Sequence, residues 1–412
     1  MRKNLSVFFF IFLFFTLDDA FSQEKNVYSL SEAIDVALKN NPEVKIAEKE
    51  IESAKGRKLQ AFSPQQPDLT FSWEGIYSGQ PLNRANTRLI GVEQTLEFPY
   101  KLFVKKSVSN REIDITYENL NRTKSLITAE GKRAFYRINH QQKLLEILES
   151  SVGLLRQFQE ATLLKYQSGD LPYFEVVRAK VEIAKTQNEI IEAKKELISA
   201  KNNLNLLLGR KGSEDFQLKD ELIFVPFLKD KAETVQEFSQ KNHTLKIAKF
   251  TKERENKNLH LANLSFIPDL RFSGGFFSER GGKFIPSFQI GFSLPLWWWN
   301  PQGQIQENKA NLNSAQLREI AFERIVKSEI EKAYELVKIS EEQVLLFEKS
   351  ILIEVDEELK AGINSYQYNQ IEAFGLLDIY RTNKTTKIEY YKALFNYLSA
   401  LADLEVAGEI TQ

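Results

Sequence analysis

Apolar positions along the chain follow two different periods. In long stretches they recur every three or four residues, which is the heptad spacing of helices that pack against other helices. The stretches 176–207 and 330–351 both follow this spacing. Within 67–99 and 268–299, apolar and polar residues alternate instead, which predicts two β-hairpins.

The sequence also repeats once, with an offset of 200 or 201 residues. The aligned pairs are Tyr166 with Tyr366, Gly169 with Asn369, Asn41 with Asn242, and Pro67 with Pro268. A period this long indicates a duplicated half-molecule rather than a solenoid of short units. We therefore expect a first structural repeat over 23–215 and a second over 216–412, with the two repeats folding together.

Each repeat has the same predicted order: a helix, a β-hairpin, a very long helix and a closing helix. The predicted helices span 30–62, 101–166, 172–208, 234–264, 302–365 and 372–407. In the first repeat the two flanking helices total about 105 Å and the middle helix about 99 Å, so the short ones would match the long one when stacked end to end. The predicted fold class is mainly α with a small β part, built from long antiparallel coiled-coil helices.

The two hairpins have the length and alternation of transmembrane β-strands. Leu69, Phe71 and Trp73 alternate with polar residues in the first hairpin, and Phe288 and Ile290 do so in the second. Alternation over about ten residues is typical of strands that cross a lipid bilayer. A half-buried hairpin of a water-soluble protein has the same pattern, so the alternation alone leaves both interpretations open.

Aromatic residues gather where the hairpins meet the long helices. They are Phe98, Tyr100, Trp297, Trp298 and Trp299. In membrane β-barrels such residues form an interfacial girdle at the level of the lipid headgroups. We favour a girdle over a cap on a helical core, because three adjacent tryptophans cannot all point inward on a strand.

The number of predicted strands sets the number of chains in a barrel. Four strands cannot close, and open sheet edges are not tolerated in lipid. Two chains would give a barrel filled by its own side chains, whereas three chains would give a 12-stranded barrel with an open lumen. A conduit therefore points to a homotrimer, in which Glu74, Glu93, Glu97, Arg271 and Gln289 would face water.

The N-terminal segment 1–22 has the features of a secretory signal peptide. Basic residues precede an apolar run that is short for a membrane span, and Ala20 and Ser22 supply small residues at a cleavage site; a retained anchor is the alternative. The absence of cysteine excludes disulfides and lipid attachment through an N-terminal cysteine. A formal net charge of −1 gives no electrostatic case for nucleic acid binding.

The sequence carries no motif of a catalytic or metal site. It has no phosphate-binding P-loop, no H-E-x-x-H and no cysteine nucleophile. His140, His243 and His260 are scattered, and none has a second histidine at metal-binding spacing. Met1 is the sole methionine, which excludes a thioether relay for copper or silver. We predict neither an enzyme, nor a cofactor, nor a metal site.

Several short motifs, in their order and duplication, resemble the TolC family of outer membrane efflux and secretion channels. The motifs are the turns at Tyr166 and Tyr366, Leu206-Leu-Leu-Gly209, Leu376-Leu-Asp378, Ala400-Leu-Ala-Asp-Leu-Glu405 and the Pro-Asp-Leu starts of the hairpins. The resemblance extends over essentially all of the mature sequence. It implies a homotrimer with a β-barrel in the lipid of the cell outer membrane, a helical tunnel in the periplasm, and docking to a periplasmic adaptor (membrane fusion protein) and an inner membrane pump of RND or ABC type.

The same resemblance implies roles for residues at the far end of the tunnel. The adaptor contacts would be Gly169, Asp170, Leu171, Asn369, Gln370 and Ile371. The channel aperture would involve Tyr366 and Asp378. Some relatives close this aperture with an arginine–aspartate network, but Ile371 stands at the arginine position and Gly375 at a further aspartate position, so this chain lacks two members of that latch.

Our leading hypothesis is therefore the passive exit duct of a tripartite efflux system. The outer membrane component of type I secretion differs chiefly in its partners, and the chain does not separate the two. A periplasmic coiled-coil protein without a pore is the alternative from another class. A water-soluble rod would support that alternative, whereas detergent-dependent trimers would support the duct.

Overall fold

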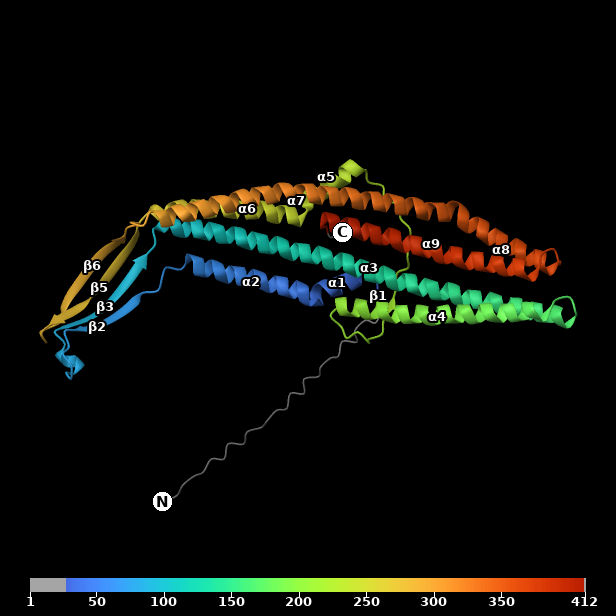
Figure 1. Cartoon of the computed structure of the whole chain (residues 1–412), viewed down its shortest axis with the longest axis horizontal. Coiled ribbons are helices and arrows are strands. Elements are labelled where there is room, and N and C mark those ends of the chain that lie inside the picture. The colour runs from blue at the N-terminus through green and yellow to red at the C-terminus, as the bar shows by residue number, and fades with distance from the viewer. Residues whose placement is uncertain (1–26, 411–412) are drawn as a thin grey trace, which may run out of the picture.

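The computed structural model describes residues 27–410, so the predicted signal peptide, 1–22, lies outside the described residues. Long helices form a rod, and a four-stranded sheet extends from one end of it (Figure 1). This arrangement confirms a mainly α fold with a small β part. The predicted barrel and trimer concern more than one chain.

The helices and strands of the two halves follow the same order, but the 3-10 turns differ in position and a π-helical turn divides the long helix of the second half. The first half consists of β1 (Val27–Tyr28), α1 (Leu30–Asn40), α2 (Pro42–Phe62), β2 (Asp68–Glu74), the 3-10 turn η1 (Leu82–Arg84), β3 (Thr87–Leu96), α3 (Pro99–Gln167) and α4 (Tyr173–Leu207). The second half consists of β4 (Gln217–Leu218), α5 (Lys231–Lys241), α6 (His243–Asn263), the 3-10 turn η2 (Leu264–Phe266), β5 (Asp269–Glu279), β6 (Ile285–Ser293), α7 (Trp299–Leu346), the π-helical turn η3 (Phe347–Ile351), α8 (Leu352–Gln367) and α9 (Ala373–Gly408). The exact boundary between the repeats, 215/216, stays a prediction.

Short helices are stacked end to end along each long helix, as their lengths predicted. α2 and α4 lie along α3, while α6 and α9 lie along α7 and α8 (Figure 1). The two stacking points are joined in the same way: Asn41 Nδ2 donates to the carbonyl of Leu207 (3.3 Å), and Asn242 Nδ2 donates to that of Ala407 (3.2 Å). The aligned asparagines therefore have the same structural role in both halves.

Three helices that we predicted as continuous are interrupted. The stretch 30–62 breaks between α1 and α2, and the stretch 234–264 breaks between α5, which begins at Lys231, and α6. At both breaks the asparagine side chain accepts a hydrogen bond from a main-chain N–H of the following helix, and Pro42 has no N–H with which to continue α1. The π-helical turn η3 interrupts the third, 302–365. The heptad pattern continues through these breaks, so it did not signal them.

The heptad positions themselves face inward, as predicted. Val176, Ala179 and Ile183 are buried on α4, and Ile330 and Val337 are buried on α7. The aligned α9 positions follow, with Leu376, Ala393, Tyr397 and Leu404 buried. The pattern thus identified the packing face of each long helix.

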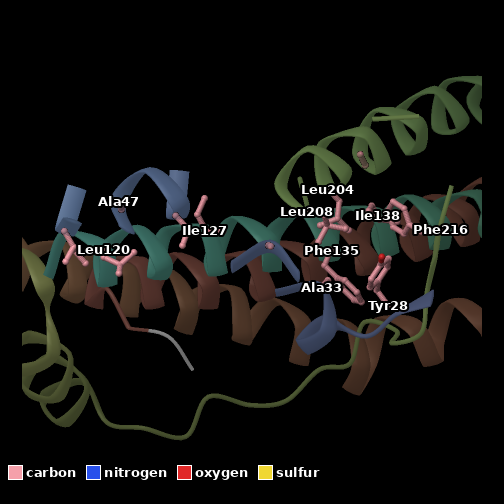
Figure 2. Packing of buried hydrophobic residues seen from close by; sticks show 14 residues of the cluster. Tyr28, Ala33, Ala47, Leu120, Ile127, Phe135, Ile138, Leu204, Leu208 and Phe216 are labelled. Atoms are coloured by element: carbon pink, nitrogen blue, oxygen red, sulfur yellow. The ribbon is translucent and has the colours of Figure 1, made fainter. Parts of the chain in front are cut away.

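Buried side chains form three clusters along the rod. One lies where α1 and α2 approach the end of α4 on α3, around Tyr28, Phe135 and Phe216 (Figure 2). A second lies in the equivalent region of the second half, on α7 and α9. A third, near the end of the rod away from the sheet, contains residues of both halves, including Phe158 and Tyr366. The rod end is therefore held by a shared core.

Within residues 27–410, every helix is too short in apolar sequence or too rich in charge to cross a membrane.

Candidate functional site

The two hairpins join into one antiparallel sheet with the strand order β2-β3-β5-β6. β3 pairs with β5 over ten residues, from Thr87 opposite Glu279 to Leu96 opposite Leu270. Within the described residues, β2 and β6 each pair on one side, so both outer edges of the sheet are open. A single chain therefore presents unpaired main-chain groups at two edges.

One face of this sheet is almost entirely apolar. The register places these residues on it: Leu69, Phe71, Trp73, Ile90, Val92, Leu96, Leu270, Phe272, Phe276, Phe288, Ile290 and Phe292. Most of them are exposed in the single chain, and Phe288 reaches 72%. An exposed apolar face of this extent marks a surface that meets another apolar phase.

The opposite face is polar. Glu93 and Arg271 form an ion pair across β3 and β5 (3.0 Å), and Ser273 donates to Gln289 (3.4 Å). Glu74 belongs to the same face. The residues that we predicted to face water on the strands therefore share one side of the sheet. Glu97 lies beyond the end of β3 and pairs with Lys105 of α3 (2.6 Å).

The predicted girdle aromatics lie at the junction of sheet and helices, but not on strands. β6 ends at Ser293, and Trp299 is the first residue of α7, so our placement of the tryptophans on a strand end was wrong. The chain turns after Ser293, which leaves the indoles exposed on a short linker and first helical turn: Trp297 68%, Trp298 57% and Trp299 58%. Phe98 and Tyr100, at the start of α3, are exposed at the equivalent junction. A cap on a helical core would bury these side chains; the girdle itself stays a prediction.

The junction between sheet and helices is fastened by buried charge. Lys101 of α3 donates to Asp269 at the start of β5 (2.8 Å) and to the carbonyl of Ile267 (2.7 Å). The Lys101 side chain is only 10% exposed. Because an unpaired lysine would be costly there, this pair holds the sheet at a defined position on the helices.

Among the described residues, each layer of the chain contains four elements and has two open edges. Near the sheet the helices follow the order α2-α3-α6-α7, and toward the other end they follow α4-α3-α9-α8. One edge of every layer belongs to the first half (β2, α2, α4), and the other belongs to the second half (β6, α7, α8). Each end of a layer is therefore free to pack against another element, and the two ends differ in sequence.

Both helical edges carry a second heptad stripe that faces away from the chain. On α4 it contains the exposed residues Phe174, Val177, Val181, Ala184, Ile191 and Ile198, and on α7 and α8 it contains Leu336, Ile339, Leu346 and Ile353. Our sequence analysis missed these stripes, although their three- and four-residue steps are visible beside the inward frame. Exposed heptad stripes are typical of helices that pack on a further helix.

Two equivalent turns end the rod, and we call them the tip: 168–172 and 368–372. At each turn main-chain N–H groups close a Schellman motif, with Asp170 donating to Lys165 (2.8 Å) and Gln370 donating to Ser365 (2.7 Å). Gly169 has φ +84° and Asn369 has φ +57°, so the asparagine adopts the left-handed conformation that the aligned glycine adopts.

The structure brings the predicted tip residues together. Gly169, Asp170, Asn369 and Gln370 are exposed, and Leu171 and Ile371 are half-buried against the tip core. Lys165 joins the two turns, because its Nζ donates to the carbonyl of Tyr366 (3.1 Å) and to the side chain of Asn369. Sequence analysis did not identify Lys165, since nothing local distinguishes it from the other lysines of α3.

The two predicted aperture residues differ in accessibility. Asp378 is exposed on α9, whereas Tyr366 is only 4% exposed and packs against Phe158 and beneath the ammonium group of Lys165 (4.0 Å to the ring centre). Burial, with a smaller contribution from Glu175, raises the pKa of Tyr366 to about 12. In the single chain Tyr366 therefore belongs to the tip core, and only Asp378 of the pair is available to solvent.

Other ion pairs lie near the positions where the latch of the relatives would be. Arg381 of α9 donates to Glu182 of α4 (2.6 Å), and Lys384 pairs with Glu189 (2.9 Å). The hydrogen bond from Arg381 holds the pKa of Glu182 below its ordinary value, despite burial. These pairs link the closing helices of the two halves, and the sequence alone did not reveal them because each pair spans nearly 200 residues.

Within residues 27–410, no cluster of three or more histidine or acidic side chains could hold a metal ion. His243 contacts Glu118 (2.5 Å) and His260 contacts the Tyr100 hydroxyl (3.2 Å), so both have structural partners. The candidate functional sites are thus the two faces of the sheet, the open edges of the sheet and helices, and the turns of the tip.

The described chain thus combines a rod of paired helices with a sheet that has one apolar and one polar face. Residues 33–210 match the family model described as outer membrane efflux protein. No curated protein matches the chain. The efflux-channel resemblance seen in the sequence is thus confirmed for most of the first half.

Solved structures extend the same fold over 92% of the chain. The Campylobacter jejuni CmeC outer membrane channel matches with a TM-score of 0.77, at 15% identity and over 85% of its own chain. The Vibrio cholerae outer membrane protein VceC matches with 0.76, at 16% identity and over 96% of its chain. The Neisseria gonorrhoeae MtrE outer membrane channel, in its open state, matches with 0.77, at 16% identity and over 88%. At these identities the matches establish the fold.

Proposed function

We propose that this protein is the outer membrane channel of a tripartite efflux system, a passive duct made by three copies of the chain. The observation that carries the proposal is the sheet, which has an exposed apolar face, a polar face and two open edges. An apolar outer face suits lipid, and a polar inner face suits a water-filled lumen. A pore-free rod in the periplasm would leave this apolar face in water.

Closure follows from the unlike edges of the chain. The first-half edge of one copy would meet the second-half edge of the next at all three levels: β2 with β6, α2 with α7, and α4 with α7 and α8. Contacts between unlike edges form a ring when the rotation closes. Three copies supply twelve strands, which leaves a lumen, and joining β2 to β6 removes the edges that lipid does not tolerate.

The helical rod would then lie in the periplasm and receive its partners at the tip. A periplasmic adaptor and an inner membrane pump of RND or ABC type would supply the energy and the substrate. The exposed turns, with Gly169, Asp170, Asn369 and Gln370, are the proposed adaptor contacts, and Leu171 and Ile371 support them from below. The girdle of Phe98, Tyr100 and Trp297–Trp299 would lie at the periplasmic membrane surface.

Asp378 is the proposed aperture residue. Three copies would place three carboxylates around the axis, which would favour cations in the narrowest part of the duct. We expect Asp378→Ala to lower the preference for cations in reversal-potential measurements. Unchanged conductance and selectivity would remove Asp378 from the aperture.

The first test of the proposal is single-channel recording in a planar bilayer, with the oligomeric state of the same detergent-purified sample determined by mass. Stable conductance steps from a trimer are the expected result. A folded helical protein that stays monomeric and soluble without detergent, and does not insert, would overturn the channel and leave a periplasmic coiled-coil protein.

A further inference from the structure

The end of the sheet away from the helices carries several cations. This loop end comprises the connections 75–86 and 280–284 and the first two residues of β3, 87–88. Its basic residues are Arg84, Arg88, Arg280 and Lys283. None of the four makes an ion pair with another residue in the described part of the chain, 27–410. Arg271, in the middle of the polar face, is paired with Glu93. The loop end therefore has positive charge that the chain does not balance.

Arg88 is placed on the apolar face. In the register it lies between Trp73 of β2 and Ser278 of β5, so its side chain is on the same face of the sheet as the exposed aromatic and aliphatic residues. Its guanidinium carbon lies 5.7 Å from the centre of the Phe284 ring. Its Nε is buried without a hydrogen-bond partner. A guanidinium on an apolar face without an anion is costly, so this position favours an anion from outside the chain.

The nearby carboxylates are on the wrong side to supply that anion. Glu74 and Glu279 lie on the polar face. Both are paired with Thr87, Glu74 from the neighbouring strand β2 and Glu279 from the neighbouring strand β5, and Thr87 points to the face opposite that of Arg88. The sheet itself separates them from Arg88. The missing anion therefore belongs to whatever covers the apolar face.

The chemistry of the site identifies a phosphate group. The planar guanidinium fork matches the oxygens of a phosphate in a bidentate arrangement, and Lys283 and Arg280 on the adjoining turn add positive charge. Phe284 provides an apolar surface beside the guanidinium, as an acyl chain would require. Arg88 is the second residue of the ten-residue strand β3, so it lies at the depth of the headgroups when the strand spans the bilayer.

We propose that the loop end binds a phosphate group of an anionic lipid in the outer leaflet, with the guanidinium of Arg88 as the bidentate donor and Lys283 and Arg280 as supporting cations. This inference rests on the proposed function, since it requires the apolar face to meet lipid with the loop end outward. The lipid phosphate would neutralise the positive charge of the loop end and fix the depth of each chain in the membrane.

The test is native mass spectrometry of the full protein in mild detergent, titrated with bisphosphorylated lipid A, with dephosphorylated lipid A and with inorganic phosphate. We expect the protein to retain the bisphosphorylated lipid and Arg88→Gln to weaken retention by at least about tenfold, the usual effect of losing hydrogen bonds to a charged group. Arg88→Lys, which keeps the charge but loses the fork, should fall between them. Arg271→Gln, on the polar face of the same sheet, should retain the lipid as the unaltered protein does.

Each contrary result has a distinct meaning. Equal retention of the dephosphorylated lipid would show apolar adsorption and overturn the phosphate site. Displacement by millimolar inorganic phosphate would indicate a free-anion site instead of a lipid site. Conductance of Arg88→Gln in a planar bilayer separates this inference from the channel itself: normal conductance with unchanged lipid retention sinks only the lipid site, whereas no channel in any variant, including the unaltered protein, sinks the proposed function.

Discussion

The two helical hairpins that form the tip have similar sequences and different surroundings. Tyr166 and Tyr366 align, yet Tyr166 is 41% exposed and contacts Tyr173 of its own hairpin (5.2 Å), whereas Tyr366 is 4% exposed within the tip core. Lys165 of the first hairpin reaches across to the second turn. The duplication therefore copied the turn, while packing gave the second copy the interior position.

The long helices of the two halves differ as well. α3 continues for 69 residues, whereas its counterpart is interrupted by the π-helical turn Phe347–Ile351. On the tip side of this turn, a groove of ≈ 340 Å³ separates α3 from α8 and α9 and is lined by Lys143, Asp356 and Lys387, among others. Single π-helical turns within α-helices are frequently found at functional sites. The long helix of the first half is thus continuous, whereas its counterpart in the second half is interrupted next to this groove.

The largest expected effect comes from the edges, of which each half supplies one. Val181→Asp on α4 and Leu346→Asp on α7 should each abolish the trimer, because every interface of the ring would bury an unpaired carboxylate. Sedimentation or native mass spectrometry in detergent measures this. Gln187→Asp, an exposed position of α4 outside the stripe, is the matched control and should leave the trimer intact.

A mixture of the two edge variants sharpens the same comparison. If unlike edges meet, a Val181→Asp chain and a Leu346→Asp chain share one unaltered interface, so open dimers should accumulate. Like edges meeting like edges would instead give homodimers of each variant, through its own unaltered edge. Recovery of that second pattern would contradict the ring.

The two aligned tyrosines provide the next effect. Tyr366→Ala should destabilise the tip by about 3–4 kcal/mol through loss of a buried ring, and Tyr166→Ala by less than about 1 kcal/mol. Tyr366→Phe should be neutral or stabilising, because the buried hydroxyl has no hydrogen-bond partner in the described chain. Hydrogen exchange of residues 155–185 and 360–385 reports this order, and equal effects at 166 and 366 would contradict the difference in packing.

The ion pair between the closing helices should make the tip sensitive to acid. The pKa of Glu182 is lowered in the folded protein, so its contribution to stability is present above the ordinary glutamate pKa of about 4.3 and is lost as the pH falls through the lower, folded value. Glu182→Gln should remove about 2 kcal/mol at neutral pH and abolish this part of the acid response. Conductance and tip hydrogen exchange between pH 7 and pH 3 measure both, and an unchanged acid response in Glu182→Gln would exclude the pair as its source.

The smallest expected changes in stability come from substitutions in the two turns of the tip. Gly169→Ala should cost about 1 kcal/mol, because alanine is strained at φ +84° although nothing lies within 4 Å of the added carbon. Asn369→Gly should change stability by only a few tenths of a kcal/mol through the turn itself, with an added loss of the hydrogen bond from Lys165. Thermal unfolding of the purified variants compares them, and a Gly169→Ala protein as stable as the parent would show that this turn rearranges.

Much of the architecture is encoded in local sequence, because helices and strands bury one face at a fixed period. The inward heptads of α4, α7 and α9 and the alternation of the strands followed from that periodicity. The stacking of short helices on long ones followed from the helix lengths, and the repeat followed from the aligned residues of the two halves. The turn at Asn369 was predictable for another reason: asparagine is one of the few residues other than glycine that adopt the left-handed conformation of this turn.

The tertiary structure alone decided which of two equivalent sequences lies inside. The burial of Tyr366, the bridge from Lys165 and the pairing of Glu182 with Arg381 join residues about 200 positions apart, and periodicity carries no information about such contacts. The sequence also did not show that the tryptophans follow the strand instead of ending it. The last residue of β6 depends on its register with β5, which is a tertiary contact. The periodicity of apolar residues determines which face of a helix or strand is apolar, whereas the packing of the two halves determines which residues that face contacts.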